Sequence, residues 1–149
     1  MKYNFKKIEK KWKNKHDSIK FKKKKKKKYY ILNMFPYPSG YGLHIGHTIG
    51  YIYSDIIAKY KLVKNYNILN PIGFDSFGLP AEQFAIINNQ HPSIIIKKSI
   101  KKYKKQIKNL GIFFNFKNEI NTSNSKYYKW TQYIFIKLFN SWYNKKKKI

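Results

Sequence analysis

At 149 residues, the chain has the size of a single domain that can bury a modest core. Lysine and arginine together number 33 against 6 acids, a formal net charge of +27, and every basic residue is a lysine. The absence of cysteine excludes disulfides and thiolate metal sites, and no apolar run is long enough to cross a bilayer.

The positive charge by itself does not identify a partner. A chain this basic is typical of proteins that bind nucleic acid or an anionic membrane surface. However, the abundant residue types (lysine, asparagine, isoleucine, tyrosine and phenylalanine) can all be encoded with A and T alone, which indicates an AT-rich genome. Proteins that recognise phosphate usually keep some arginine, because its planar guanidinium binds phosphate through two hydrogen bonds. The lysine excess therefore leaves RNA binding and codon drift equally open.

The first residues of the chain do not have the pattern of a secretory signal. Residues 1–15 alternate lysine with Phe, Ile and Trp, and they lack a continuous apolar segment and a small-residue cleavage site. A basic organellar leader stays open as an alternative, although such leaders favour Arg and Ser and this stretch has neither. We therefore expect a cytoplasmic protein that is not bound to a membrane.

A short helix and a linker are predicted at the start of the chain. Helical spacing of apolar residues predicts an amphipathic helix over 5–14. The unbroken lysine run Lys22–Lys28 predicts a solvated linker, because like charges in a block repel one another. We expect the domain boundary after residue 28, with one continuous domain over residues 29–149.

The first predicted strand is Tyr29–Met34, a short stretch rich in aromatic and branched side chains. It ends at the loop Phe35–Gly40, whose two prolines and glycine exclude helix and strand. The chain then becomes helical over His44–Tyr60. One apolar stripe follows this helix and contains Ile49, Ile52, Tyr53, Ile56, Ile57 and Tyr60.

The second predicted strand, Asn67–Ile72, precedes another loop punctuated by glycine and proline, Gly73–Pro80. The proline that closes this loop suits the first turn of a helix continuing through Ala81–Asn89. A further helix is predicted over Ser93–Leu110, with Gly111 as its C-terminal stop.

The last predicted helix, Ser125–Tyr143, is strongly aromatic, and one of its faces must be buried against other protein. That face contains Trp130, Ile134, Phe135, Leu138 and Trp142. Strands and helices alternate along the chain, which predicts an α/β fold with a parallel sheet and helical crossovers. One such unit is only part of a doubly wound domain, so the domain is expected to be incomplete.

The first loop leads into chemistry suited to phosphate. His44, Gly46 and His47 fall at the predicted start of a helix, where unpaired backbone N–H groups attract anions. The missing side chain of Gly46 lets a flat ligand lie against the backbone. Two imidazoles there can donate hydrogen bonds to phosphate oxygens as charge develops in a transition state. Taken alone, two histidines at this spacing could also be surface residues or half of a metal site, although no further ligand follows and His91 is isolated.

The second loop adds a carboxylate at the same expected edge of the sheet. Asp75 is one of only 6 acids and lies between two glycines. It could cap the following helix, or it could bind a cationic group of a ligand such as an ammonium. Phe35 and Tyr37 supply apolar surface near the first loop. Together these residues predict a site for ATP and an apolar amino acid.

Both loops resemble the signatures of class I aminoacyl-tRNA synthetases in their leucyl form. The first resemblance is Met34–Gly40 followed by His44–His47, and the second is Gly73–Glu82. Tyr127–Gln132 is also similar to a leucyl-family stretch. One departure is Asn115–Glu119, where the family usually has an Asp-Trp pair followed by Ser-Arg-Glu; the losses of Trp and Arg fit the AT-rich composition.

The resemblance implies the fold, the reaction and the roles of single residues. It implies the first half of a Rossmann-like class I catalytic domain that activates leucine with ATP and transfers it to tRNA(Leu), with Mg²⁺ accompanying ATP. His44 and His47 would be catalytic and would bind ATP together with Gly46. Phe35, Tyr37 and Asp75 would bind the amino acid, and no metal ligand is expected in the chain.

The resemblance also implies that much of the enzyme lies elsewhere. The family's Lys-Met-Ser-Lys-Ser loop, editing domain and anticodon-binding helices have no counterpart in the chain. We therefore expect it to be a truncated ligase that is weak or inactive alone, with a second chain as a candidate for the missing catalytic half. The lysine run Lys145–Lys148 indicates an adenine tract at which a reading frame could slip.

Two other functions fit part of the sequence. A stand-alone nucleotidyltransferase shares the His-x-Gly-His pattern, but it would place the pattern nearer the start of the chain and leaves Gly73–Glu82 unexplained. A lysine-rich RNA-binding module would bind phosphates in a salt-dependent manner. That function leaves both glycine loops unexplained.

Overall fold

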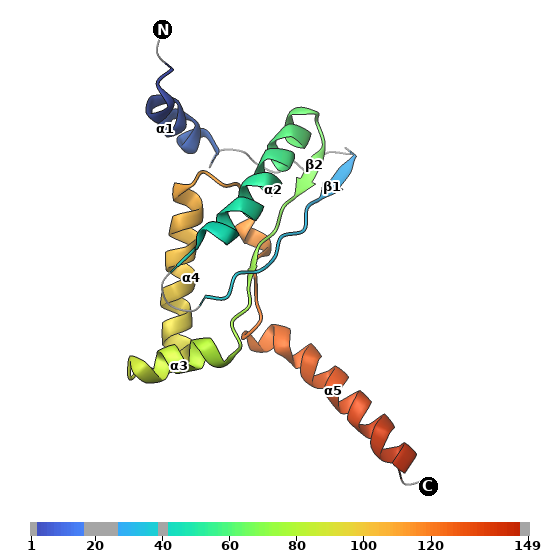
Figure 1. The fold of residues 1–149 in the computed structure, drawn as a ribbon. Coiled ribbons are helices and arrows are strands. Elements are labelled where there is room, and N and C mark those ends of the chain that lie inside the picture. Colours follow the sequence, from blue (N-terminus) through green and yellow to red (C-terminus); the bar gives the residue numbers. More distant parts are fainter. Residues whose placement is uncertain (1–2, 17–26, 39–41, 147–149) are drawn as a thin grey trace.

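The computed structural model describes residues 3–16, 27–38 and 42–146. Its elements, in chain order, are α1 (Phe5–His16), β1 (Lys28–Tyr30), α2 (Ile45–Val63), β2 (Asn67–Leu69), β3 (Gly73–Phe74), α3 (Leu79–Ile87), α4 (Pro92–Asn109), a short 3₁₀ turn η1 (Phe116–Asn118), β4 (Ile120–Asn121) and α5 (Ser125–Lys146) (Figure 1).

All five predicted helices are present, with boundaries within a few residues of those predicted. Pro80 lies in the first turn of α3, and Gly111 follows the end of α4 with a φ of +71°. Two predictions fall largely outside the described residues. These are the linker at Lys22–Lys28, of which residues 22–26 are not described, and the end of the first loop at Ser39–Gly40.

The strands are parallel, as predicted, but shorter than predicted. β1 pairs with β2 and β3 pairs with β4, both in parallel register. The predicted first strand keeps its regular ladder only to Tyr30, and the predicted second loop begins with the strand β3. The ladder is interrupted at Asn70 and Pro71, because a proline has no N–H to donate. The side chain of the buried Asn70 accepts a hydrogen bond from Asn33 at 2.7 Å and donates one to the carbonyl of Phe113 at 2.8 Å.

The segment that carries β2 and β3 runs through the centre of the sheet. On one side, the N–H of Ile31 donates to the carbonyl of Leu69 at 3.0 Å. On the other side, the N–H of Asn115 donates to the carbonyl of Asn70 at 2.8 Å. The two two-stranded sheets, β1 with β2 and β3 with β4, are thus joined along this segment, and each crossover between parallel neighbours contains a helix, as the fold class requires.

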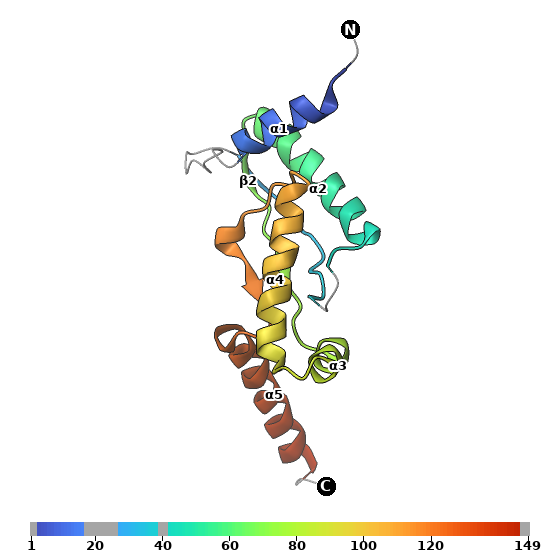
Figure 2. The same ribbon diagram turned by 90° about the vertical axis from the view of Figure 1, so that its left-hand side faces the viewer.

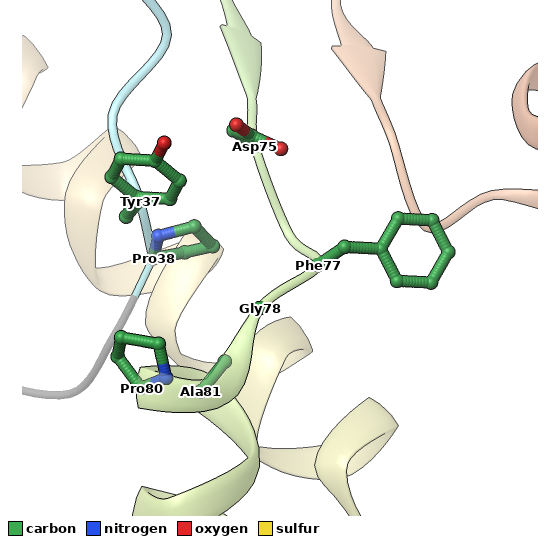
Figure 3. A pocket seen from close by; sticks show the side chains of 7 residues that line it. All are labelled: Tyr37, Pro38, Asp75, Phe77, Gly78, Pro80 and Ala81. Atoms are coloured by element: carbon green, nitrogen blue, oxygen red, sulfur yellow. The ribbon is translucent and has the colours of Figure 1, made fainter.

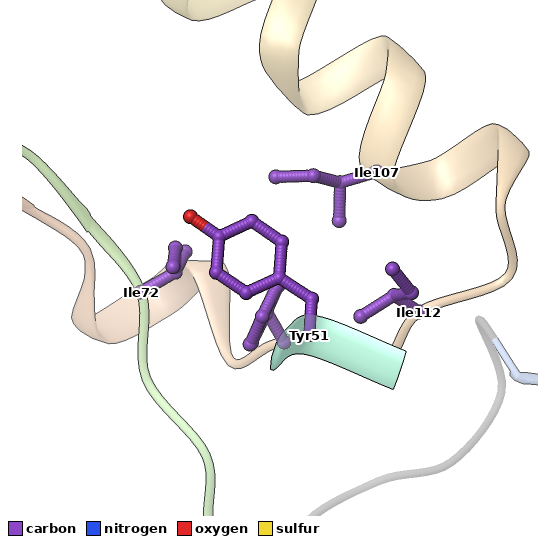
Figure 4. Close-up of a cluster of buried hydrophobic side chains, with 5 residues drawn as sticks. Tyr51, Ile72, Ile107 and Ile112 are labelled. Carbon is purple, nitrogen blue, oxygen red and sulfur yellow. The ribbon is translucent and has the colours of Figure 1, made fainter. Parts of the chain in front are cut away.

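Helices α2 and α4 cover one face of this sheet. Tyr51 of α2 and Ile107 of α4 meet over the central Ile72, together with Ile112 and Phe114 (Figure 4). A second cluster of Ile31, Ala58 and Ile68 joins α2 to β1 and β2. Alternate residues of the first strand segment, Tyr30, Leu32 and Met34, are exposed. Because side chains alternate along a strand, they lie on the opposite face, which no described helix covers.

Helix α2 turns its polar side toward the core. Its buried residues are Tyr51, Ser54, Asp55 and Ala58. The Asp55 carboxylate accepts a hydrogen bond from the N–H of Phe113 at 2.8 Å and forms an ion pair with Lys59. Lys59 in turn donates to the carbonyl of Gly111 at 3.0 Å. The helix is thus tied by charge and hydrogen bonds to the turn after α4, and its predicted apolar stripe is exposed along its whole length.

Helix α5 projects away from the remaining elements in both views (Figures 1 and 2). None of its described residues is buried, and the face that was expected to be covered is exposed, including Trp130 at 60% and Leu138 at 66%. The face that was expected to be covered therefore has no covering surface within the described part of the chain, whereas Tyr128 near the start of the helix packs edge-on against Phe77 at 5.9 Å.

Candidate functional site

The N-terminus of α2 is closed by the two histidines of the first loop. His44 is the N-cap, and its Nδ1 accepts the backbone N–H of His47 at 3.3 Å. His47 returns the bond, since its Nδ1 accepts the backbone N–H of His44 at 3.4 Å. The two rings stack with their centroids 3.7 Å apart. This reciprocal arrangement is a capping box built from histidine in place of the usual Ser and Glu.

The capping bonds select the tautomer of both rings. A nitrogen that accepts a backbone N–H carries no proton, so each neutral ring holds its proton on Nε2. The pKa of His47 lies below its usual value because burial disfavours the charged ring and the neighbouring His44 adds repulsion. In this tautomer the two imidazoles present Nε2–H donors beside the positive end of a helix, an arrangement that suits an anion.

Gly46 leaves the space that the His44 ring occupies. A Cβ atom at this position would lie 2.9 Å from Cε1 and 3.0 Å from Nδ1 of His44. Any side chain would therefore displace the ring from its capping position. The glycine is needed for this contact in addition to the flat approach of a ligand expected from the sequence.

The first loop is held by side chains from two helices. The hydroxyl of Tyr51 donates to the carbonyl of Met34 at 3.1 Å, and the hydroxyl of Tyr103 donates to the carbonyl of Tyr37 at 2.9 Å. Burial raises the pKa of both hydroxyls above its usual value, with a smaller repulsive contribution of Tyr103 at Tyr51, so both remain donors. Neither tyrosine was predicted as a site residue from the sequence. Tyr51 carries a signal, since it lies on the side of its helix opposite the apolar stripe, whereas Tyr103 shares a face with the buried isoleucines of α4.

The second loop holds Asp75 from a distant part of the chain. Thr122, just after β4, donates its hydroxyl to Oδ1 of Asp75 at 3.2 Å and accepts the N–H of Ser76 at 2.8 Å. The alternative that Asp75 caps the following helix is wrong, because the N-cap of α3 is Gly78 and has no side-chain bond. The half-buried carboxylate thus keeps capacity for a cationic ligand.

Asp75 forms part of the wall of an open pocket of about 480 Å³ (Figure 3). Its other lining residues are mostly apolar and comprise Tyr37, Pro38, Phe77, Gly78, Pro80 and Ala81. Small-molecule sites typically have this size and this mixture of apolar walls with few polar groups. The pocket therefore suits a small ligand with one cationic group and one apolar group.

Of the two aromatic residues expected beside the amino acid, only Tyr37 lines this pocket. The Phe35 ring lies against the backbone of Gly73, where an added Cβ would come within 2.3 Å of it. Phe35 therefore joins the first loop to the start of β3, and Gly73 is the residue that permits the contact.

The two loops lie side by side. The N–H of Asp75 donates to the carbonyl of Pro36 at 3.1 Å. Tyr103 joins the histidines to the pocket. Its ring meets that of His47 edge-on at 6.4 Å, and its hydroxyl donates to the carbonyl of Tyr37, which lines the pocket. The histidines and the Asp75 pocket are thus supported by one set of contacts.

The isolated histidine, His91, has a structural role. His91 is the N-cap of α4, where its Nδ1 accepts the N–H of Ser93 at 3.2 Å. Among residues 3–16, 27–38 and 42–146, no group of three or more His, Asp or Glu side chains could hold a metal ion. The helices of this part of the chain also include none with the length and apolar character needed to cross a membrane.

Known proteins with similar sequences support the family resemblance that the two loops carry. A family model described as tRNA synthetases class I (M) matches residues 29–149. Curated leucine–tRNA ligases match nearly the whole chain. That of Cytophaga hutchinsonii is 53% identical over 96% of this chain and 16% of the relative, and that of Amoebophilus asiaticus is 56% identical over 95% of this chain and 16% of the relative.

Solved structures give the same result. The chain is similar to the leucyl-tRNA synthetase of Agrobacterium radiobacter in a ternary complex with tRNA and LeuAMS, with a TM-score of 0.80 and 33% identity over 94% of this chain and 18% of that one. It is also similar to the methionyl-tRNA synthetase of Mycobacterium tuberculosis in complex with methionyl-adenylate, with a TM-score of 0.63 and 25% identity over 69% of this chain and 20% of that one.

The family match covers both loops and all elements from β1 to α5. The resemblance found in the sequence is thereby confirmed. The chain spans about a sixth of the length of the leucine–tRNA ligases that it matches. It belongs to the class I tRNA synthetases, as a homologue of one segment of the leucine–tRNA ligases.

Proposed function

We propose that the chain forms the part of a leucine–tRNA ligase active site that binds leucine and ATP for adenylate formation. The observation that carries this proposal is the position of Asp75. Its carboxylate lies in the wall of an apolar pocket, next to a loop whose two histidines close a helix N-terminus. The carboxylate and the apolar wall suit an α-amino acid with an apolar side chain, and the helix N-terminus suits a phosphate.

In the proposed complex, Asp75 binds the leucine ammonium and Tyr37 contacts the amino acid. The Nε2–H groups of His44 and His47 donate to phosphate oxygens as negative charge develops on them, which makes these two residues the catalytic pair. Such chemistry needs correct positioning and charge stabilisation and no protein nucleophile. Mg²⁺ would arrive with the triphosphate. Leucine would then be transferred to tRNA(Leu), with the cytoplasm as the proposed location.

Several apolar surfaces of this chain are exposed and would be covered by the rest of a ligase. Parallel sheets occur almost only with both faces buried, yet Leu32 and Met34 are 78% and 85% exposed on one face. The apolar stripe of α2 and most of α5 are exposed as well. We propose that other parts of a ligase, on the same or a second polypeptide, cover these surfaces and complete the triphosphate site. Alone, the chain should activate leucine weakly or not at all.

Leucine-dependent ATP–pyrophosphate exchange tests this function directly. We would measure it for the chain alone and after mixing with a polypeptide that carries the remaining length of a leucine–tRNA ligase. The expected result is little exchange by the chain alone, recovery in the mixture, and no recovery with the Asp75→Asn variant. Exchange that recovers equally well with Asp75→Asn would refute the assignment of the leucine site.

A further inference from the structure

The outer face of α4 consists almost entirely of lysine. The inward residues of this helix, including Ile95, Tyr103 and Ile107, are buried against the sheet and α2. The lysines of the outward side are all exposed and comprise Lys97, Lys98, Lys101, Lys102, Lys105 and Lys108. We call these residues the α4 lysine face.

No acid in the described part of the chain forms an ion pair with the α4 lysine face. The helix itself contains no Asp or Glu. Within the described residues, the ion pairs are Lys59–Asp55 and Lys104–Glu119, and Lys104 lies at the inward edge of the helix. Lys98 donates to the neutral amide oxygen of Gln90 at 3.0 Å. Like charges at i and i+4 destabilise a helix, so the bare face carries a cost that a polyanion would relieve.

The spacing along the helix suits an extended row of negative charges. Residues four apart on a helix are separated by about 6 Å along the axis, so Lys97, Lys101, Lys105 and Lys108 extend over roughly 16 Å. Lys13 of α1 packs beside Gly111, just beyond the end of α4, and lengthens the basic tract. Lysine acts as a mobile point charge, which suits phosphates of a backbone better than specific base contacts.

Lysines elsewhere in the chain have a different environment. On α5, Lys129 lies over the ring of Trp130 at 5.0 Å and Lys137 lies over that of Tyr133 at 5.6 Å. Those lysines are interleaved with exposed aromatic residues, whereas the α4 lysine face is a continuous patch of a single charge. Both helices lack Asp and Glu, so what distinguishes α4 is that its lysines form one continuous face without interleaved aromatic residues.

We propose that the α4 lysine face binds the phosphate backbone of RNA and that its RNA is the tRNA on which the proposed ligase acts. The identity of the RNA rests on the proposed function, whereas the binding surface rests on charge alone. Each lysine that neutralises a phosphate contributes about 0.7–0.9 to the slope of log K against log salt concentration. Four such contacts therefore contribute roughly three units to this slope.

Fluorescence anisotropy with a labelled tRNA(Leu) transcript tests the proposal on the full chain. The test variant is Lys97→Gln/Lys101→Gln/Lys105→Gln/Lys108→Gln. The matched control removes the same charge from α5, as Lys126→Gln/Lys129→Gln/Lys137→Gln/Lys145→Gln. At about 100 mM salt we expect at least about tenfold weaker binding for the α4 variant, with a slope smaller by roughly three, and a smaller loss for the control.

Equal losses in the two variants would show that only net charge matters and would overturn the proposal, as would no loss in either. Circular dichroism and thermal unfolding check that both variants fold. Binding of a leucyl-adenylate analogue separates this proposal from the proposed function. Retained analogue binding with lost tRNA binding supports both, whereas retained tRNA binding by the α4 variant refutes the surface alone.

Discussion

The two loops at the sheet edge are built in different ways. In the first, His44 and His47 hold each other through bonds that reach only three residues along the chain. In the second, Asp75 depends on Thr122, which lies 47 residues later. The first loop is thus a local motif attached to a helix, and the second exists only once β3 has paired with β4.

This difference has a consequence for stability and for recognition. A local motif survives modest changes elsewhere, because its partners are close in sequence and little chain entropy opposes them. A site assembled across the sheet is lost when the sheet is disturbed. Mutations in the elements that hold both loops should therefore damage both. Mutations within one loop should weaken the binding of only one part of the ligand, leucine or ATP.

The largest effect is expected from removing Asp55, which ties α2, the helix that carries the histidines, to the turn after α4. In Asp55→Ala, the N–H of Phe113 loses this acceptor and Lys59 loses its ion pair. Loss of a buried hydrogen-bonded carboxylate should lower the free energy of unfolding by about 2–3 kcal/mol. Urea unfolding followed by circular dichroism measures this change. Asp55→Asn keeps an acceptor for Phe113 and should cost less; an equal cost would place the effect in the ion pair alone.

The next largest effect concerns the second loop. Asp75→Asn removes the charge proposed to bind the leucine ammonium, and hydrogen bonds to charged groups contribute about 1.5–3 kcal/mol. Leucine affinity should therefore fall by about 10- to 100-fold, while ATP affinity stays unchanged. NMR titration with each ligand separates the two results. A matched fall in ATP affinity would show that the two loops are not separable.

Thr122→Val tests the second loop through a residue that lies 47 positions from Asp75 in the sequence. The substitution keeps the shape of the side chain but removes the hydroxyl that joins Asp75 to the N–H of Ser76. We expect a severalfold loss of leucine affinity, smaller than that of Asp75→Asn, because the charge remains but is less well oriented. Thr122→Ser restores the hydroxyl and should restore binding. An unaffected Thr122→Val variant would remove Thr122 from the account.

A substitution in the first loop, Gly46→Ala, should change stability little but should clearly weaken ATP binding. In Gly46→Ala the new Cβ displaces the His44 ring, so ATP affinity should fall while leucine affinity is kept. Alanine favours the helix over glycine by up to about 1 kcal/mol, which offsets the lost cap. Thermal unfolding should therefore change little while ATP binding weakens. A variant that binds ATP normally would contradict the role assigned to the histidines.

The smallest effect is a pH dependence. The pKa of His47 is lower in the folded chain than its usual value, so the unfolded state binds a proton more readily. The contribution of His47 to stability is complete above the unfolded pKa near 6.5 and is lost as the pH falls through the folded value. Protonation also removes the acceptor for the N–H of His44. Unfolding midpoints should decline more between neutral and acidic pH for the wild type than for His47→Gln.

The sequence predicts best what depends on neighbours along the chain. The helices, their caps and the His44–His47 motif follow from periodicity and from residues within one turn. The fold class and the family follow from the two signature loops, and the comparisons confirm them. The exposed stripe of α2 shows the limit, because a stripe predicts a covered face but not which part of the protein covers it.

Long-range contacts could not be read from the sequence. Nothing near Thr122 indicates that it orients Asp75, and nothing near Asn70 indicates a fully buried amide that replaces ladder bonds. Asp55 was a partial exception. It is an acid inside a helix, away from the apolar stripe, in a chain with only 6 acids, and such a residue is rarely placed without a partner. The assignment of single residues to leucine or ATP stays a prediction.

The most direct test of one site formed by two loops is a binding cycle with a leucyl-adenylate analogue. NMR titrations of the wild type, Gly46→Ala, Asp75→Asn and the double variant would be compared for leucine, for ATP and for the analogue. We predict that leucine responds only to Asp75→Asn, ATP only to Gly46→Ala, and the analogue to both. An analogue whose affinity depends on only one loop, or on neither, would contradict a shared adenylate site.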